Sequence, residues 1–449
     1  MIAAERLSCV PDPSMIDFNS NPQLKLDVAY RQTYSPMVEQ GAAGHLESMS
    51  EIDTCVSFIE RGNQPAVAYN LYRNQFAEPY LGYWRQVEAF ASELEPMHGS
   101  IKSTVIIAAE AAEIVPLARS LENYTHQNCD PSTVEILLYV NRKQDSNCTS
   151  QAILDKVGMF KEAHSQLAVH IVDDVIANDE QLSTIKKRAV DIAVSRWSMS
   201  PQYRDNGYTF ILNDADTARL HPDYIASYQQ MFGHHILADV AVQTHDLDPE
   251  AFRQLGPTFT FGARVRQLIE RQHERNAKAF FPEGFDMAIR PAFYCAVGGF
   301  IAGMPYGEDY SFGKLLLHYR HGTSSALLLK PERTGIYTSA RRPALHYARN
   351  LRSGTNSRGD AEIDNLLRSG VYPKIIEEDT LQHNIEAELH RIDDYFADTD
   401  IPAGHPIITN TAAYFGVNSE NRADRGYVVK DLGAFATAYA SGIASMDIA

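Results

Sequence analysis

The stretch ILNDADTARL, residues 211–220, decides how this chain is interpreted. An apolar run, YTFIL, is typical of a buried strand, and it ends in an asparagine followed by two aspartates one residue apart, Asp214 and Asp216. Two carboxylates this close repel each other unless a cation lies between them. The stretch therefore raises the question of a divalent metal at the end of this strand.

Apolar runs and amphipathic stretches alternate along the chain before this pair. Strand patterns cover residues 103–109, 134–141 and 167–175, and helix patterns cover residues 113–127, 153–164 and 181–197. This alternation predicts an α/β domain whose mainly parallel, doubly wound sheet carries helices on both faces. Ligands of such sheets bind at the carboxyl ends of the strands. Asp214 and Asp216 follow one of these ends.

Length and composition are those of a globular protein. At a usual size of about 150 residues per domain, 449 residues predict about three domains, or one large domain with extensions. Hydrophobic residues make up 44% and charged residues 22%, which is enough apolar material for an ordinary core. The net charge of −17 argues against a general binder of nucleic acid or of anionic membranes, since both need a basic surface.

Cysteine usage and the amino terminus bear on the cellular compartment. Five scattered cysteines without a C-x-x-C pair favour a reducing compartment over a disulfide framework or a zinc knuckle. The first residues, MIAAERLSCVPDPS, lack the basic region and the long apolar run of a signal peptide. No apolar run approaches the roughly 18 residues of a membrane span. We therefore expect a cytoplasmic protein with no membrane span.

Three regions are expected along the chain. Residues 1–100 are predicted to form a mostly helical extension, residues 101–345 the main domain, and residues 346–449 a helical and loop-rich extension. In the first region, aromatic residues recur at three- and four-residue steps, at Tyr69, Tyr72, Phe76, Tyr80, Tyr83 and Trp84. Pro79 should break or kink this helical pattern. The stripe packs against the main domain, which is the more common case, or it receives a sugar or a lipid.

A second acidic pair follows the first by about a hundred residues. The segment EGFDMAIRPAFYCAVGGF, residues 283–300, leads into GMPYGEDYSFG, residues 303–313. Glu308 and Asp309 lie there at an expected helix start. Two interpretations stay open, namely acidic residues favoured by the helix dipole and a general base beside a substrate.

With these blocks in order, the chain resembles the glycosyltransferases of the GT-A fold, and among them family 2 of inverting enzymes. The blocks that carry the resemblance are Ala108-Ala109-Glu110, Asn141, Lys186 with Ala189, Asp214-Ala215-Asp216, Ala288-Ile289-Arg290, Gly298-Gly299-Phe300, Gly307-Glu308-Asp309 and TSARR at 338–342. The resemblance covers about residues 101–345. It implies a Rossmann-like, mainly parallel mixed sheet, with a nucleotide-binding half at 101–216 and an acceptor half at 217–345.

The resemblance also implies a donor site. The nucleotide-sugar-binding residues would be Ala108, Glu110, Asn141, Lys186, Asp214, Ala215, Asp216 and Gly299. Asp216 would bind Mn²⁺ or Mg²⁺, hard cations that suit carboxylates, and Asp214 would contact the metal or the donor ribose. Lys186 would add positive charge beside the diphosphate.

Catalysis is expected at the second acidic pair. Asp309 would accept the proton of the acceptor hydroxyl, and Glu308 would orient that base or bind the acceptor. Gly298 and Gly299 would let the backbone approach the sugar closely, or they simply form a turn. His346 would cap the metal, or it is an ordinary surface or core histidine.

The sequence thus predicts a metal-dependent, inverting, non-processive glycosyltransferase. The donor would be a UDP- or GDP-sugar, the acceptor a carbohydrate or small molecule, and a homodimer is open. An inactive sugar-nucleotide-binding or scaffold protein of the same fold is the alternative. A sugar-nucleotide nucleotidyltransferase is disfavoured because no Gly-rich, Arg-containing loop follows the first strand, and a dehydrogenase because no G-x-G-x-x-G does.

Overall fold

The computed structural model describes residues 4–6, 65–74, 81–146, 149–204, 207–234, 240–243, 245–251, 254–255, 284–303, 308–309, 312–313, 327–329, 335–341 and 344. The chain divides into two compact units. The first comprises residues 1–11, 36–246 and 280–338, and the second comprises residues 12–35, 247–279 and 339–449. The sheet and every predicted site residue except His346 belong to the first unit; His346 lies outside the described residues.

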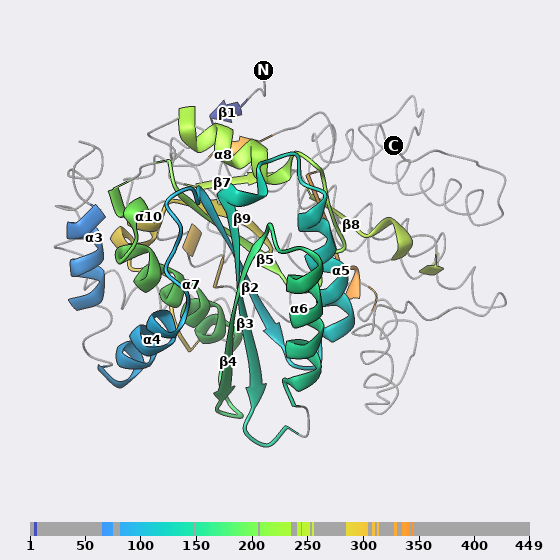
Figure 1. Ribbon diagram of the computed structural model, residues 1–449, viewed down its shortest axis with the longest axis horizontal. Coiled ribbons are helices and arrows are strands. Elements are labelled where there is room, and N and C mark those ends of the chain that lie inside the picture. The colour runs from blue at the N-terminus through green and yellow to red at the C-terminus, as the bar shows by residue number, and fades with distance from the viewer. Residues whose placement is uncertain are drawn as a thin grey trace, which may run out of the picture. The chain divides into compact units, whose positions relative to one another are not determined.

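The first unit is built on an eight-stranded mixed sheet (Figure 1). In spatial order the strands are β1 (Ala4–Arg6), β10 (Leu327–Leu329), β7 (Val240–Gln243), β9 (Asp286–Ile289), β5 (Thr209–Asp214), β2 (Ser103–Glu110), β3 (Val134–Lys143) and β4 (Ala168–Ile176). The last four run parallel to one another, whereas β9 is antiparallel to both of its neighbours. This confirms the predicted α/β class with a mainly parallel mixed sheet.

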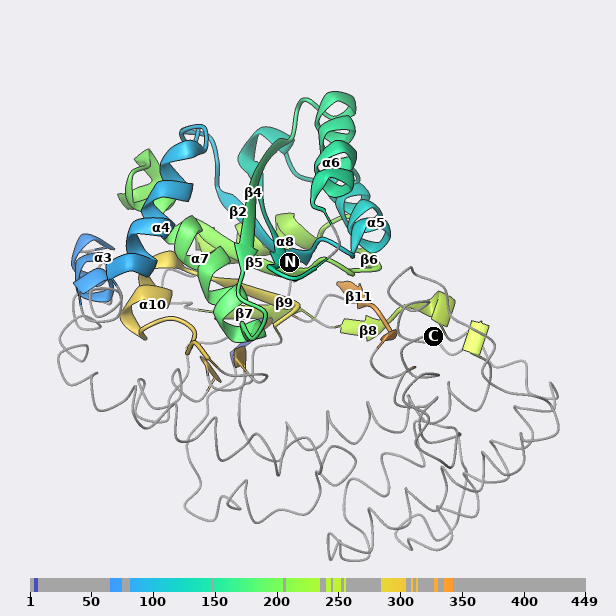
Figure 2. The same cartoon turned by 90° about the horizontal axis from the view of Figure 1, so that it is seen from below.

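Helices cover both faces of the parallel strands (Figures 1 and 2). α4 (Leu81–Glu93) and α7 (Leu182–Ser198) share a core with Ile106 and Leu137, whereas α5 (Ile114–Thr125) and α6 (Gln151–Ala163) share a core with the alternate residues Val105 and Ile136. Successive side chains of a strand point to opposite faces, so strands covered on both sides are apolar throughout. This explains the unbroken apolar runs in the sequence.

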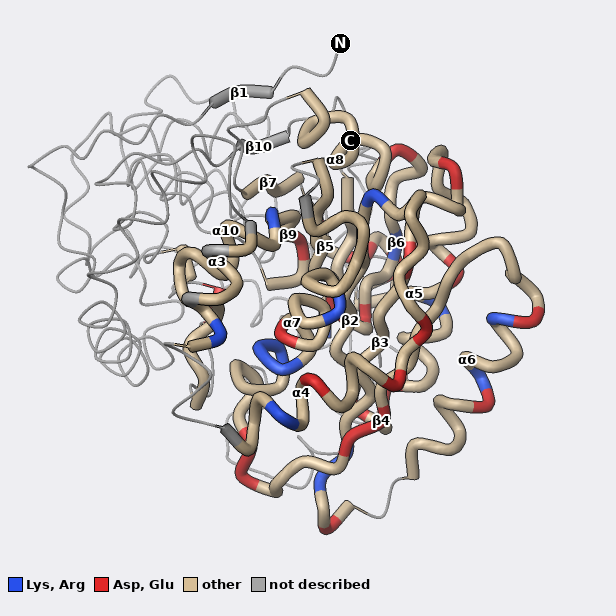
Figure 3. The backbone as a smooth tube through the Cα atoms, turned by 60° about the vertical axis from the view of Figure 1, so that its left-hand side comes forward, with Lys and Arg blue, Asp and Glu red and all other residues tan. Residues whose placement is uncertain are grey.

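Three further helices and a second sheet follow among the described residues. α3 (Pro65–Tyr72) and α10 (Pro291–Ala296) add side chains to the core beneath α7, and α8 (Tyr224–His234) adds to the opposite core. A second, three-stranded sheet has the order β6 (Arg219–Leu220), β11 (Ile336–Thr338), β8 (His245–Leu247). On the surface, acidic and basic residues are mixed along α6 (Figure 3).

The aromatic stripe of the first hundred residues belongs largely to the core. Tyr72 and Trp84 are 1% and 3% exposed and share the α4/α7 core, which confirms that they pack against the main domain. Phe76, Pro79 and Tyr80 lie outside the described residues. The division of the chain at residues 100 and 345 stays a prediction.

A single buried carboxylate joins helices α3, α4 and α7. Asp191 of α7 is fully buried and accepts hydrogen bonds from the hydroxyls of Tyr72 (2.5 Å) and Tyr83 (2.7 Å). The Lys187 ammonium, one turn earlier on α7, lies 3.1 Å from the second Asp191 oxygen. Buried charge is tolerated only when paired and hydrogen-bonded, so α3, α4 and α7 depend on one another here.

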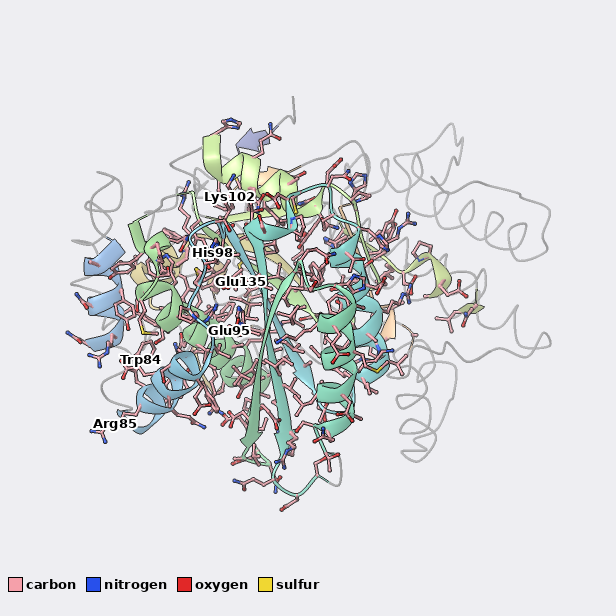
Figure 4. The ribbon with its side chains drawn as sticks, viewed as in Figure 1. Trp84, Arg85, Glu95, His98, Lys102 and Glu135 are labelled. Atoms are coloured by element: carbon pink, nitrogen blue, oxygen red, sulfur yellow. The ribbon has the colours of Figure 1, made fainter. Side chains whose placement is uncertain are left out.

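A second buried charge lies at the amino-terminal edge of the sheet. Glu135 of β3 is 1% exposed, and its Oε1 accepts from Arg196 Nη1 and Thr104 Oγ1, both at 2.6 Å. Burial by itself would raise the pKa of Glu135, but the contacts of His170 and Arg196 outweigh burial and hold that pKa below its usual value. Figure 4 shows Glu135 against the sheet and Arg85 pointing away from it.

A third buried acid joins β9 to α8 and to β7. Asp286, at the start of β9, is fully buried; its Oδ1 accepts from Tyr224 (2.7 Å) and Tyr228 (2.6 Å), and its Oδ2 accepts from the Gln243 N–H (2.9 Å). Burial raises the pKa of Asp286 from 3.8 to about 6 despite these three donors.

Asp286 therefore predicts a pH dependence of folding. Between pH 3.8 and about 6 the folded state holds a proton that the unfolded state has lost, so this group makes folding less favourable as the pH rises through that window. Asp286→Asn cannot titrate at this position, so urea unfolding from pH 4 to 7.5 should show the free energy of unfolding of the parent falling by about 2.5 kcal/mol relative to the variant. A difference between the two proteins that is constant with pH would contradict the raised pKa.

Candidate functional site

Four of the predicted donor residues lie toward the carboxyl ends of three adjacent parallel strands. The strand register pairs Asp214 of β5 with Ala108 of β2, and it pairs Glu110 of β2 with Asn141 of β3. Because side chains alternate along a strand, these four share the face of the sheet that α7 covers. This edge is where ligands of parallel sheets bind.

Hydrogen bonds hold the ends of β2 and β3 together. The Asn141 side chain is buried, and its Nδ2 donates to the Ala109 carbonyl at 2.8 Å, while the Asn141 carbonyl accepts from the Ala111 N–H at 2.9 Å. The backbone N–H of Glu110 donates to the Glu113 carboxylate at 3.0 Å. Asn141 thus stabilises the strand ends, and its contact with a nucleobase stays a prediction.

Lys186 is the centre of the site. Its ammonium lies 3.1 Å from Asp214 Oδ1 and 3.0 Å from Glu308 Oε1, and it donates to the Gly284 carbonyl at 3.2 Å. Burial would lower the pKa of Lys186, but the charges of Asp214, Glu308 and Asp309 outweigh burial and raise it above its ordinary value. Lys186 is therefore a permanent cation that joins the strand-end aspartate to the second acidic pair.

The second acidic pair faces this lysine from the other side. The Asp309 carboxylate accepts from the Gly284 N–H at 3.0 Å through Oδ2. Glu308 is buried and Asp309 is half-buried. The structure thus brings together Asp214, Lys186, Glu308 and Asp309, although Lys186 and Asp309 are 123 positions apart in the sequence.

Gly284 is a residue of this site that the sequence reasoning missed. It lies two residues before the start of β9, inside the EGFDMAIR segment, and its backbone contacts both Lys186 and Asp309. A glycine beside a polar cluster is the signal that could have identified it, because glycine permits close approach of the backbone.

The site contains more acidic than basic side chains, which is relevant to the binding of a divalent metal. Lys186 faces three carboxylates, from Asp214, Glu308 and Asp309, and Asp216 adds a further, half-buried one two residues after Asp214. Among the described residues no group of three or more His, Cys, Asp or Glu side chains could by itself hold a metal ion. Mg²⁺ and similar ions, however, commonly use one or two carboxylates together with substrate phosphates, so the donor set fits a metal that binds with a diphosphate.

Gly299 and its neighbour lie in a turn with unusual backbone angles. Gly299 has φ +68°, and a Cβ there would lie 2.8 Å from the Tyr294 ring and from the Tyr72 hydroxyl. The absence of a side chain at Gly299 thus lets the side chains of Tyr294 and Tyr72 pack closely against its backbone. A contact between Gly299 and a sugar stays a prediction, as does any ligand contact of Ala215, which is 3% exposed.

Known proteins give the following comparisons. No family model matches the chain, and no curated protein matches it. Solved structures that match include S. aureus TarS 1–349 in complex with UDP-GlcNAc, with 11% identity over 76% of this chain and 92% of that chain and a TM-score of 0.34. The mannosyltransferase PcManGT from Pyrobaculum calidifontis, in complex with GDP-Man and Mn²⁺, matches with 15% identity over 84% and 98% of the two chains and a TM-score of 0.32.

A mycobacterial protein also matches, with 12% identity over 64% of this chain and 78% of that chain and a TM-score of 0.31. None of the helices in the described ranges combines the length and the apolar character that a membrane crossing requires.

Proposed function

We propose that this protein transfers a sugar from a nucleotide-sugar donor to an acceptor hydroxyl, with inversion at the anomeric carbon. The observation that carries the proposal is the convergence of Lys186 with Asp214, Glu308 and Asp309 at the carboxyl edge of the parallel strands. One fixed cation and several acids at that edge suit a reaction in which a diphosphate leaves and a hydroxyl loses a proton.

The donor would lie along the ends of β2, β3 and β5. Glu110 and Asn141, which are paired in the strand register, would contact the nucleoside, and Asp214, which lies beside Lys186, would contact the ribose or the metal. Lys186 would contribute positive charge beside the diphosphate. We take the donor to be a UDP- or GDP-sugar and the acceptor to be a carbohydrate or a small molecule.

A divalent metal, Mn²⁺ or Mg²⁺, belongs to this proposal because of the charge balance. Asp216, with Asp214 beside it, would hold the ion. When bound, the metal would neutralise the leaving diphosphate. Lys186 alone offers one positive charge against three carboxylates, which is too little to attract a diphosphate as well.

Asp309 would act as the general base. Its Oδ2 accepts from the Gly284 N–H, which orients the carboxylate for proton transfer. Glu308, paired with Lys186, would orient the base or bind the acceptor. A single base that activates the attacking hydroxyl implies direct displacement, and hence inversion of the anomeric centre.

Binding of nucleotide sugars tests the proposal without knowledge of the acceptor. We expect UDP- or GDP-sugars to raise the unfolding temperature with Mn²⁺ present, because a ligand at a hundredfold excess over its Kd adds about 2.7 kcal/mol of stability. Asp216→Asn should weaken this Mn²⁺-dependent binding, since a neutral amide is a poorer metal ligand.

An exposed acid, Asp155 of α6, supplies the control, and Asp155→Asn should bind as the parent does. A parent protein that binds no nucleotide sugar, with or without Mn²⁺, would overturn the proposed function. Equal binding by Asp216→Asn in Mn²⁺ would overturn the metal assignment alone and leave sugar transfer standing.

A further inference from the structure

The backbone of Gly284 contacts both the cation of the site, Lys186, and the proposed base, Asp309. Its carbonyl accepts from the Lys186 ammonium at 3.2 Å, and its N–H donates to Asp309 Oδ2 at 3.0 Å. The residue is buried and lies two positions before the start of β9. A single glycine thus determines how far the cation lies from the base.

No side chain fits at this position without moving the charged groups. A Cβ on Gly284 would lie 2.7 Å from Lys186 Nζ, 3.1 Å from Asp309 Oδ2 and 3.1 Å from Glu308 Oε1. The backbone itself is not the obstacle, because the positive-φ glycines of the described chain are Gly298, Gly299 and Gly303.

The group that has to move is the end of a flexible side chain. The closest contact is with Lys186 Nζ, and a lysine has four side-chain torsions through which its ammonium can shift. An alanine at 284 would therefore displace the Lys186 ammonium most and shift the Asp309 and Glu308 carboxylates less, without removing any charged group.

We propose that Gly284 is a positioning residue of the site. Because it lacks a side chain, the Lys186 ammonium can lie between Asp214 and Glu308, and the Gly284 N–H holds the Asp309 carboxylate. The proposal rests on the proposed function, because Lys186 matters here as the cation beside a nucleotide diphosphate. Gly284 itself touches neither substrate. It acts through Lys186 on donor binding and through Asp309 on proton transfer.

A double-mutant cycle separates this role from a merely structural one. The measurement is the calorimetric Kd of UDP and GDP in Mn²⁺ for the parent, Gly284→Ala, Lys186→Met and the double variant. Hydrogen bonds to charged groups contribute about 1.5–3 kcal/mol, so each single variant should bind about 10-fold or more weakly. Because the alanine acts through Lys186, the double variant should bind no more weakly than Lys186→Met alone.

Gly158→Ala is the matched control. Gly158 lies in α6, where an added Cβ meets nothing within 4 Å, and its variant should bind as the parent does. Thermal unfolding of Gly284→Ala should remain cooperative and close to that of the parent, because only the end of a side chain has to shift.

Each other outcome is decisive. Parent-like affinity of Gly284→Ala, a further loss in the double variant, or an unfolded Gly284→Ala would assign Gly284 to packing and overturn this inference while sugar transfer stands. Failure of the parent to bind any nucleotide would instead overturn the proposed function itself.

Discussion

Asp309→Asn is expected to lower the rate of sugar transfer by about 10²- to 10⁴-fold, the usual loss when a general base is removed. The amide keeps the size of the carboxylate, and its oxygen can still accept from the Gly284 N–H. What it loses is the ability to take a proton at neutral pH. The measurement is release of nucleoside diphosphate from the sugar donor, with water or a supplied hydroxyl compound as acceptor.

Donor binding separates this role from a general loss of the site. Asp309 would contact the acceptor hydroxyl and not the donor, so the Kd of the nucleotide sugar should change little. Asp155→Asn on α6 removes an exposed acid and should turn over normally. Near-normal turnover by Asp309→Asn, or a product with retained anomeric configuration, would show that Asp309 is not the general base.

Arg196→Met is expected to cost about 3–5 kcal/mol of folding free energy, the usual penalty for leaving one partner of a buried ion pair alone. Glu135 is 1% exposed and Arg196 Nη1 lies 2.6 Å from it, so the variant retains a carboxylate that water cannot reach. The measurement is the free energy of unfolding in urea at pH 7.

Two further variants make this test specific. Arg196→Met combined with Glu135→Gln removes the orphaned charge and should recover part of the loss. Arg85→Met removes an exposed arginine that points away from the sheet (Figure 4), and surface changes of this kind usually stay within about 0.5 kcal/mol. Equal effects of Arg196→Met and Arg85→Met would show that the buried pair contributes nothing.

The strands and helices between residues 103 and 214 could be predicted because their signals are local. Apolar runs of strand length alternate with helical patterns there, and four parallel strands follow. The position of β9 was not predictable in this way. It inserts between β5 and β7 in the antiparallel direction, and the buried Asp286 at its start looks like a surface residue to any local rule.

The run Lys186-Lys187-Arg188 shows why the site could be predicted only in part. Successive residues of a helix point about 100° apart, so three adjacent cations face three different surroundings. Lys186 meets Asp214 and Glu308, Lys187 meets Asp191, and Arg188 meets Asp174. The resemblance to family 2 indicates Lys186, but the residue types of the three positions alone do not distinguish Lys186 from its two neighbours.

The shared carboxylate of Asp191 limits where this protein can be cut. A fragment that begins at residue 101 would lack Tyr72 and Tyr83, the two hydroxyls that solvate Asp191 in place of water. The charge would then open to solvent along α7, the helix that also carries Lys186. A fragment that keeps both hydroxyls on Asp191 within intact helices therefore has to include α3, which begins at Pro65, although the first of the four adjacent parallel strands begins only at Ser103.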